Sequence, residues 1–241
     1  MNLTLVIPTY NEAENLPRLV SALFHLPLEG LHLLIVDDNS PDGTGALAEE
    51  LARQYPMQVI HRSGKLGLGT AYIQGFQHAL DAGAQAIGQM DADFSHPVEK
   101  IPALLAALQT CDVALGSRYV PGGRLDKHWP LWRKALSAFG NLYARTILGL
   151  PVRDVTGGFR LWRRETLERM PLARVRSNGY AFQVEMIYLA CQMGFRCQEI
   201  PIYFADRQWG TSKMSFAIQR EAAIRVWQIK WEYRHLHPAR R

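Results

Sequence analysis

The chain has 241 residues, of which 48% are hydrophobic, so it can build the core of one sizeable domain. It has no run of 18 or more apolar residues, which argues against a membrane-spanning helix, and its three cysteines have neither metal-ligand nor redox spacing. The net charge is +5, and residues 215–241 hold six Arg or Lys against two Glu. A basic segment of this kind indicates contact with a polyanionic surface, either anionic lipid or nucleic acid.

Apolar runs alternate with amphipathic stretches through the first half of the chain. They predict strands at 3–7, 31–36, 57–61, 85–90 and 112–117, and helices at 12–24, 44–55, 70–82 and 97–109. This alternation is typical of right-handed βαβ units and a mainly parallel sheet flanked by helices. Such sheets bind ligands at the C-terminal edges of their strands.

The second half is less regular. We expect a loop over 121–130, a helix with a strong apolar face over 131–150, a tight turn at 156–159 that enters a short strand, and a helix over 182–193. A strand over 195–204 and a polar loop over 206–213 follow.

The last predicted helix, from 216 to about 235, has two apolar faces. One is an aliphatic stripe, which we expect to pack on the domain, formed by Ile218, Ala222, Val226, Ile229, Tyr233 and Leu236. The other holds Ile224, Trp227 and Trp231 beside Arg220, Lys230 and Arg234. Tryptophan with basic residues is typical of an interfacial helix, so we expect this face to rest on a membrane surface. The alternative is that both faces are buried, one of them in a dimer.

Two aspartates follow the apolar run 86–90. Asp91 and Asp93 are two residues apart on an extended chain, so their side chains share a face and would repel each other without a cation. Carboxylate oxygens suit Mg²⁺ or Mn²⁺ that carries substrate phosphates. Ser95 could offer one weak oxygen, and His96 is more plausible as a structural neighbour than as a ligand of a hard ion. An Asp-x-Asp triplet alone is a weak motif, but other polar clusters fall at the same predicted sheet edge.

The end of the second strand predicts a nucleotide site. Asp38 is placed to receive ribose hydroxyls or a base edge, with Asp37 as the structural alternative. Tyr10 could pack on a base and Glu12 could accept a hydrogen bond, although core packing and helix capping would also explain them. The first strand is followed by neither a G-x-G-x-x-G fingerprint nor a P-loop, which disfavours NAD and simple NTPase functions.

A set of basic residues could bind a further phosphate group: Arg118, Arg124, Lys127, Arg133, Lys134, Arg207 and Lys213. Arg118 leaves a strand at the same edge as the aspartates. Scattered surface charge is the better interpretation of Arg124 and Lys127.

Taken together, these segments resemble the family 2 inverting glycosyltransferases, and among them the dolichol- or polyprenol-phosphate mannose synthases without transmembrane segments. The matching stretches are VIPTYNEAENL, VDDNSPDGT, GKLGLGTAY, MDADFSHP, GSRYVPGG, DVTGGFRLWRRE, NGYAFQVEM and DRQWGTSKM. They span 6–214, so the resemblance covers nearly the whole chain.

The resemblance implies a GT-A type fold and a nucleotide-sugar donor, GDP-mannose being the expected one. By position, the nucleotide would be lined by Pro8, Tyr10, Glu12, Val36, Asp38 and Ala92. It implies Asp91 and Asp93 as metal ligands, Arg118, Arg207 and Lys213 as phosphate-binding catalytic residues, and Arg133 and Ser137 as further acceptor-phosphate contacts. Some relatives carry Gln in place of Ser95, so the third metal ligand stays open.

The expected reaction transfers mannose with inversion to a polyprenyl monophosphate. A phosphate oxygen can attack without a general base, and the sequence offers no compelling catalytic His or Glu. Alternatives are another nucleotide sugar, such as UDP-glucose, or a sugar nucleotidyltransferase. We expect a catalytic domain over 1–214 and a basic amphipathic helix with a tail over 215–241, peripheral on the cytoplasmic face of a membrane, with lipid and not nucleic acid as its partner. The sequence leaves the existence of a partner subunit open.

Overall fold

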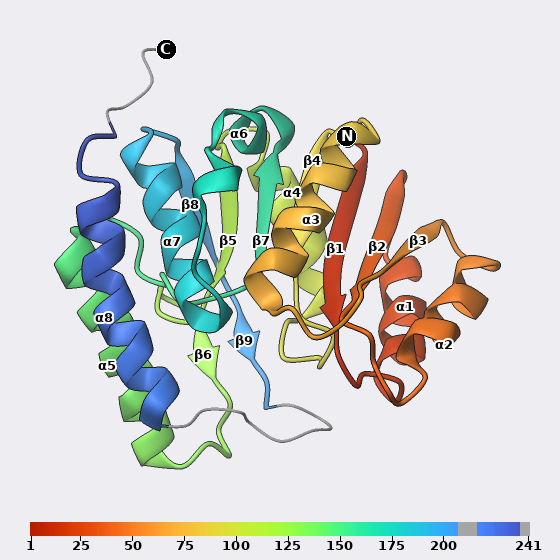
Figure 1. The fold of residues 1–241 in the computed structure, drawn as a ribbon, viewed down its shortest axis with the longest axis horizontal. Coiled ribbons are helices and arrows are strands. Elements are labelled where there is room, and N and C mark those ends of the chain that lie inside the picture. The colour runs from red at the N-terminus through yellow and green to blue at the C-terminus, as the bar shows by residue number, and fades with distance from the viewer. Residues whose placement is uncertain (207–215, 237–241) are drawn as a thin grey trace.

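A computed structural model describes residues 1–206 and 216–236 of the chain. A central sheet holds seven strands: β1 (Leu3–Thr9), β2 (Leu31–Asp37), β3 (Met57–His61), β4 (Ala86–Gln89), β5 (Val113–Ser117), β7 (Arg160–Arg163) and β8 (Cys197–Pro201). Their order is β3-β2-β1-β4-β7-β5-β8, and every neighbouring pair is parallel except the two that β7 makes with β4 and β5 (Figure 1). The predicted α/β class with a mainly parallel sheet is confirmed.

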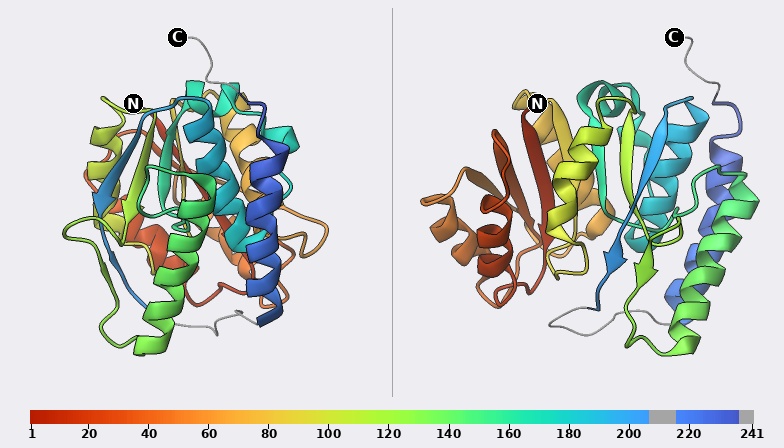
Figure 2. Two further views of the ribbon diagram at one scale, coloured as in Figure 1. Left: turned by 90° about the vertical axis from the view of Figure 1, so that its left-hand side faces the viewer. Right: turned by 180° about the vertical axis from the view of Figure 1, so that it is seen from behind.

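Helices cover both faces of the sheet because successive strand residues point to opposite sides. Val6 packs in one core, and its neighbours Leu5 and Ile7 pack in the other. The core that contains Val6 lies under α3 (Leu68–Asp81), α5 (Leu131–Leu148), α7 (Gly179–Gln192) and α8 (Phe216–Glu232), and the opposite one under α1 (Leu16–Phe24), α2 (Thr44–Ala52) and α4 (Ile101–Ala107) (Figure 2).

Several shorter elements differ from the prediction. The predicted strand 195–204 divides into β8, which joins the central sheet, and β9 (Tyr203–Phe204), which pairs with β6 (Arg124–Leu125) in a second small sheet. The predicted loop 121–130 therefore contains a strand. The sequence patterns also missed α6 (Arg164–Arg169), and two 3-10 turns occur at η1 (Val98–Lys100) and η2 (Leu172–Arg174). The first helix begins at Leu16 because the four residues before it form a turn.

Helix α8 packs on α5 and α7 through its aliphatic stripe. Val226, Ile229 and Tyr233 are buried, whereas Trp227 and Trp231 are 56% and 67% exposed. The predicted orientation of the helix is confirmed for these residues, and the side chain of Ile218 lies outside the described ones. Since α8 shares the core of the sheet, the division at residue 214 stays a prediction.

The strand directions fix where a ligand can bind. Because β7 is antiparallel to both β4 and β5, these two strands run in the same direction as β1 and β2, and all four end at one edge of the sheet. That edge is at the bottom of Figure 1. In the described part of the chain, none of the helices has the length and apolar character needed to cross a membrane.

Candidate active site

The two carboxylates at the end of β2, Asp37 and Asp38, have different surroundings. Asp37 is 2% exposed and accepts hydrogen bonds from the Thr9 hydroxyl at 2.9 Å and from the Ser40 amide at 3.0 Å. Asp37 therefore joins the ends of β1 and β2 and has a structural role, as the alternative interpretation proposed. Asp38 stays the predicted ligand contact.

Asp38 sits in a network with the basic, glycine-rich loop that follows β3. The Arg62 guanidinium bonds to Asp38 Oδ1, and the Gly67 amide donates to Oδ2 at 2.9 Å. Arg62 also donates to the Gly67 carbonyl at 3.2 Å and to the Thr70 hydroxyl at 2.6 Å. Each carboxylate oxygen has a second lone pair, so Asp38 can still accept a hydrogen bond from a base or ribose.

The end of β1 brings two more predicted residues to this edge. The ammonium of Lys65 lies 3.9 Å from the centroid of the Tyr10 ring, so Tyr10 already contacts the glycine-rich loop. Glu12 accepts from the Asn15 side chain at 2.7 Å, and its own amide donates to Thr44 at 2.9 Å. The Glu12 carboxylate thus contacts the side chain that precedes α1, but no side chain caps the first amides of this helix, so the capping interpretation is not confirmed.

The remaining nucleotide candidates differ in what they can offer. Pro8 is half-buried at the end of β1, and Ala92 is buried between the two aspartates. The Val36 side chain is fully buried and packs against α3, where a Cβ on Gly75 would lie 3.2 Å from its Cγ2. A nucleotide could therefore meet Val36 only through its main chain.

The Asp-x-Asp segment has the chemistry of a divalent-metal site. Asp91 is half-buried, and the buried Asp93 accepts the Ser95 amide at 3.0 Å across a turn in which Phe94 has a φ of 59°. Ser95 Oγ is buried and has no hydrogen-bond partner among the described residues. A buried hydroxyl without a partner is costly, and a cation beside it would satisfy it. Within the described residues no third His, Cys or carboxylate joins the pair, so substrate oxygens and water would complete the shell.

Two buried side chains orient this segment. His96 Nδ1 accepts from the Asp91 amide at 3.0 Å, and its ring stacks on Phe159. Burial lowers the pKa of His96 below its ordinary value although Asp91 and Asp93 oppose this, so the ring is neutral and acts as an acceptor. The Tyr72 hydroxyl on α3 lies 3.4 Å from Asp91 Oδ1, and burial, together with the charge of Asp91, raises the pKa of Tyr72. The sequence patterns did not single out Tyr72.

Arg118, at the end of β5, forms a buried ion pair that the sequence patterns did not predict. Its Nε and Nη2 each donate to Asp154 at 2.7 Å, and Nη2 also donates to the Thr156 hydroxyl at 2.7 Å. Burial opposes both charges, but Arg118 still holds the pKa of Asp154 below its ordinary value, and Asp154 raises the pKa of Arg118. These contacts leave Nη1 as the part of the guanidinium that can meet a phosphate.

Of the two predicted acceptor residues on α5, Ser137 is linked to Arg118 through Tyr119. The Ser137 hydroxyl is 2.9 Å from the hydroxyl of Tyr119, the residue after Arg118. Arg133 donates to Asp206 at 3.0 Å and lies over the Trp129 ring, 3.8 Å from its centroid. The structure thus brings Ser137 near Arg118 and holds Arg133 against Asp206. Arg207 and Lys213 lie outside the described residues.

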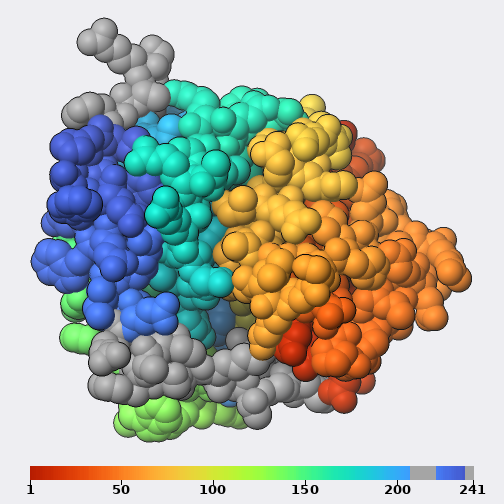
Figure 3. All heavy atoms as spheres, viewed as in Figure 1, coloured from red at the N-terminus to blue at the C-terminus, as the bar shows by residue number. Residues whose placement is uncertain are grey.

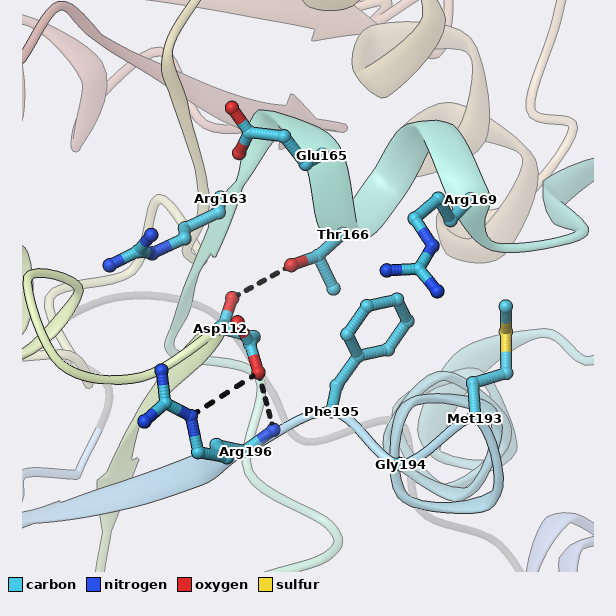
Figure 4. A pocket seen from close by; sticks show the side chains of 9 residues that line it. All are labelled: Asp112, Arg163, Glu165, Thr166, Arg169, Met193, Gly194, Phe195 and Arg196. Carbon is cyan, nitrogen blue, oxygen red and sulfur yellow. Dashed lines mark hydrogen bonds and ion pairs between the residues drawn. The ribbon is translucent and has the colours of Figure 1, made fainter. Parts of the chain in front are cut away.

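A separate hollow of about 340 Å³ lies at the opposite edge of the sheet, where β5 and β8 begin (Figure 4). Arg163 and Arg196 lie on one side of Asp112 there, and Arg169 lies beside the Phe195 ring. Asp112 accepts the Arg196 amide at 2.6 Å. None of the predicted site residues lines this hollow.

Comparison with known proteins agrees with this geometry. Residues 4–170 match the family described as glycosyl transferase family 2. The chain belongs to that family. It is therefore a glycosyltransferase, and its fold is GT-A-like.

Two relatives have high sequence identity. A polyprenol monophosphomannose synthase of Mycolicibacterium smegmatis is 47% identical over 230 residues, which cover 93% of this chain and 86% of that protein. An undecaprenyl-phosphate mannosyltransferase of Micrococcus luteus is 44% identical over 237 residues, which cover 96% of this chain and 97% of that protein.

Solved structures share the fold at low identity. A mannosyltransferase of Pyrobaculum calidifontis in complex with GDP-Man and Mn²⁺ has a TM-score of 0.63 at 16% identity and covers 96% of this chain and 64% of its own. A glucosyl-3-phosphoglycerate synthase of Mycobacterium tuberculosis in complex with Mg²⁺ and UDP has a TM-score of 0.66 at 16% identity. The match covers 96% of this chain and 78% of that one.

Proposed function

We propose that this glycosyltransferase moves a mannosyl residue from GDP-mannose to a polyprenyl monophosphate with inversion, giving a polyprenyl β-mannosyl phosphate. The observation that carries the proposal is a single sheet edge that holds a nucleotide-type carboxylate, Asp38, and a pair of metal-type carboxylates, Asp91 and Asp93. The names of the two relatives that are 44% and 47% identical support a mannosyl donor and a polyprenyl phosphate acceptor.

In this proposal the donor lies across the ends of β1, β2 and β4. Asp38 accepts from the base or ribose, and Tyr10 packs against the nucleoside, next to the cation of Lys65. Asp91 and Asp93 hold a divalent metal, with Ser95 Oγ as a third protein oxygen. When bound, Mg²⁺ or Mn²⁺ would neutralise charge that builds on the departing diphosphate.

The acceptor phosphate approaches from the side of β5 and α5. It is already anionic near neutral pH, so one of its oxygens attacks the anomeric carbon without a general base, and in-line attack inverts the configuration. The free edge of Arg118, with Ser137 and Arg133, holds that phosphate in place. Arg207 and Lys213 stay predicted phosphate contacts.

The lipid tail of the acceptor needs an apolar surface, and α5 and α8 offer one. Seven large apolar side chains on these neighbouring helices are more than half exposed: Leu131, Trp132, Phe139, Leu142, Ile224, Trp227 and Trp231. Lys230 and Arg234 lie over the rings of Trp227 and Trp231, respectively. Helix α8 forms an outer face of the molecule (Figure 3). We propose that this α5/α8 surface rests on an anionic membrane. The cytoplasmic side stays a prediction.

A transfer assay tests the proposal. The full chain is incubated with Mn²⁺, polyprenyl phosphate vesicles and either labelled GDP-mannose or labelled UDP-glucose, and the lipid phase is extracted. We expect label in the lipid phase from GDP-mannose, dependence on the metal, and a β-anomer by NMR. Faster labelling from UDP-glucose would overturn the donor, and absence of lipid label from every nucleotide sugar would overturn the acceptor.

A further inference from the structure

The glycine-rich loop of the nucleotide site is pressed against a segment more than a hundred residues later in the chain. The Gly69 amide donates to Asn178 Oδ1 at 2.8 Å. A Cβ on Gly67, whose φ is +101°, would lie 2.0 Å from Asn178 Nδ2, and a Cβ on Gly69 would lie 2.3 Å from the Ser177 carbonyl oxygen. The contact is so close that the loop cannot keep its position if Ser177 and Asn178 move.

The same loop positions Asp38. The Gly67 amide donates to one oxygen of Asp38, and Arg62 joins the other oxygen to the Gly67 carbonyl. A displacement of Gly67 therefore displaces the carboxylate that faces the nucleotide. The hydrogen bonds of Asn178 go to the Gly69 and Gly179 amides and not to Asp38, so Asn178 would act through the loop.

Helix α8 holds the other side of this segment. Arg225 Nε donates to the Ser177 hydroxyl at 2.8 Å, and the Ser177 amide donates to Glu185 at 2.8 Å. Glu185 on α7 is fully buried, and the Tyr233 hydroxyl donates to it at 2.7 Å. Arg225 Nη2 lies 3.3 Å from the same carboxylate, which makes an ion pair between the partly buried Arg225 on α8 and the buried Glu185 on α7.

We propose that Ser177 and Asn178 are positioning residues of the nucleotide site and that α8 fixes them through Arg225. This inference rests on the proposed function, because it takes Asp38 as a partner of the donor nucleotide. In this proposal one face of α8 contacts the membrane, and Arg225 on another face holds the segment that positions the donor site. The sequence predicts this helix only as a membrane-contacting addition to the catalytic domain, whereas in this proposal it also contributes to the affinity for the donor.

Nucleotide affinity measured without lipid tests this inference. Calorimetry with Mn²⁺ and GDP, and in parallel UDP, is run on the parent chain and on Asn178→Ala, Ser177→Ala and Arg225→Met. We expect Kd to rise about tenfold for Asn178→Ala and about threefold or more for the other two, because each loses hydrogen bonds that position the loop. Turnover at saturating donor should stay within about twofold, so that the donor KM changes and kcat does not. Glu221→Gln, an exposed change on the same helix, should match the parent chain.

The Ser177→Ala variant and a measurement of Tm distinguish a positioning role from a merely structural one. Ser177→Ala leaves the Arg225–Glu185 ion pair intact, so it reports on the link even if Arg225→Met fails to fold. A merely structural role would lower Tm in each variant and leave Kd of the folded fraction unchanged, which would overturn the inference alone. Failure of the parent chain to bind either nucleotide would overturn the proposed function and the inference with it.

Discussion

The donor side and the acceptor side of the site are built in different ways. On the donor side, the Asp-x-Asp turn is held by a neighbour in the sequence, since Ser95 donates to Asp93 two residues away. Asp38 is held by residues farther along the chain, Arg62 and Gly67, which are 24 and 29 residues away. On the acceptor side, arginines are held by distant partners, Arg118 by Asp154 and Arg133 by Asp206, which are 36 and 73 residues away. The metal-type carboxylates therefore depend on a local turn, whereas the arginines of the acceptor side depend on the packing of the whole fold.

The largest effect should come from the donor side, at Asp93. In Asp93→Asn the amide oxygen can still accept the Ser95 amide, so the turn survives, but one negative charge of the metal pair is lost. We expect kcat/KM to fall about 10²–10³-fold because stabilisation of the departing diphosphate is lost. The measurement is lipid-phase label against Mn²⁺ concentration, with the exposed Asp81→Asn as the control. Parent-like activity and metal dependence would refute the role of Asp93.

The next effect separates the two functions of Arg118 on the acceptor side. Arg118→Met leaves Asp154 buried without its cation, which should cost about 3–5 kcal/mol of unfolding free energy. The double variant Arg118→Met/Asp154→Asn removes that uncompensated charge, so we expect its Tm to recover. Turnover should stay about 10–100-fold low in the double variant, because the acceptor phosphate still lacks its arginine. Recovery of both would show that Arg118 has only a structural role.

The pH dependence of unfolding gives an independent test of the Arg118–Asp154 ion pair. Arg118 lowers the pKa of Asp154 in the fold, so the pair stabilises the chain at pH above the ordinary aspartate pKa of about 4. This contribution is lost as the pH falls from that value through the lowered pKa of the folded state. Denaturant unfolding between pH 6 and about 3 should therefore show a shallower pH dependence in the double variant than in the parent chain. Equal slopes would contradict the ion pair.

The membrane face of the acceptor side should give a smaller effect. We expect the double variant Trp227→Ala/Trp231→Ala to bind phosphatidylglycerol vesicles about tenfold more weakly, because two exposed rings leave the interface. Turnover of a short, water-soluble acceptor should be unchanged, since the two rings contact Tyr143, Lys230 and Arg234, which are not predicted site residues. Vesicles of phosphatidylcholine report the apolar contribution alone. Vesicle binding equal to that of the parent chain would exclude this surface as the lipid contact.

The same contrast explains what the sequence could predict. The strand-end carboxylates and the α8 stripe follow from local spacing, so Asp38, Asp91 and Val226 were placed correctly at their sheet edge or in the core. Tyr72 and Asp154 were missed because only the tertiary fold brings them to Asp91 and Arg118. The short elements β6 and α6 carry too few residues for a periodic pattern.

The smallest effect returns to the donor side and concerns Ser95. Its buried hydroxyl has no partner among the described residues, so Ser95→Ala removes an unsatisfied group and should raise the Tm of the metal-free chain slightly. If the hydroxyl contacts the metal, the same change should weaken Mn²⁺ binding about two- to fivefold in the presence of GDP, because one weak neutral ligand is lost. The variant should thus be more stable without metal but bind Mn²⁺ more weakly, so calorimetry with and without Mn²⁺ distinguishes a metal ligand from a packing residue. A higher Tm with unchanged Mn²⁺ affinity would leave the metal with two protein ligands from this segment.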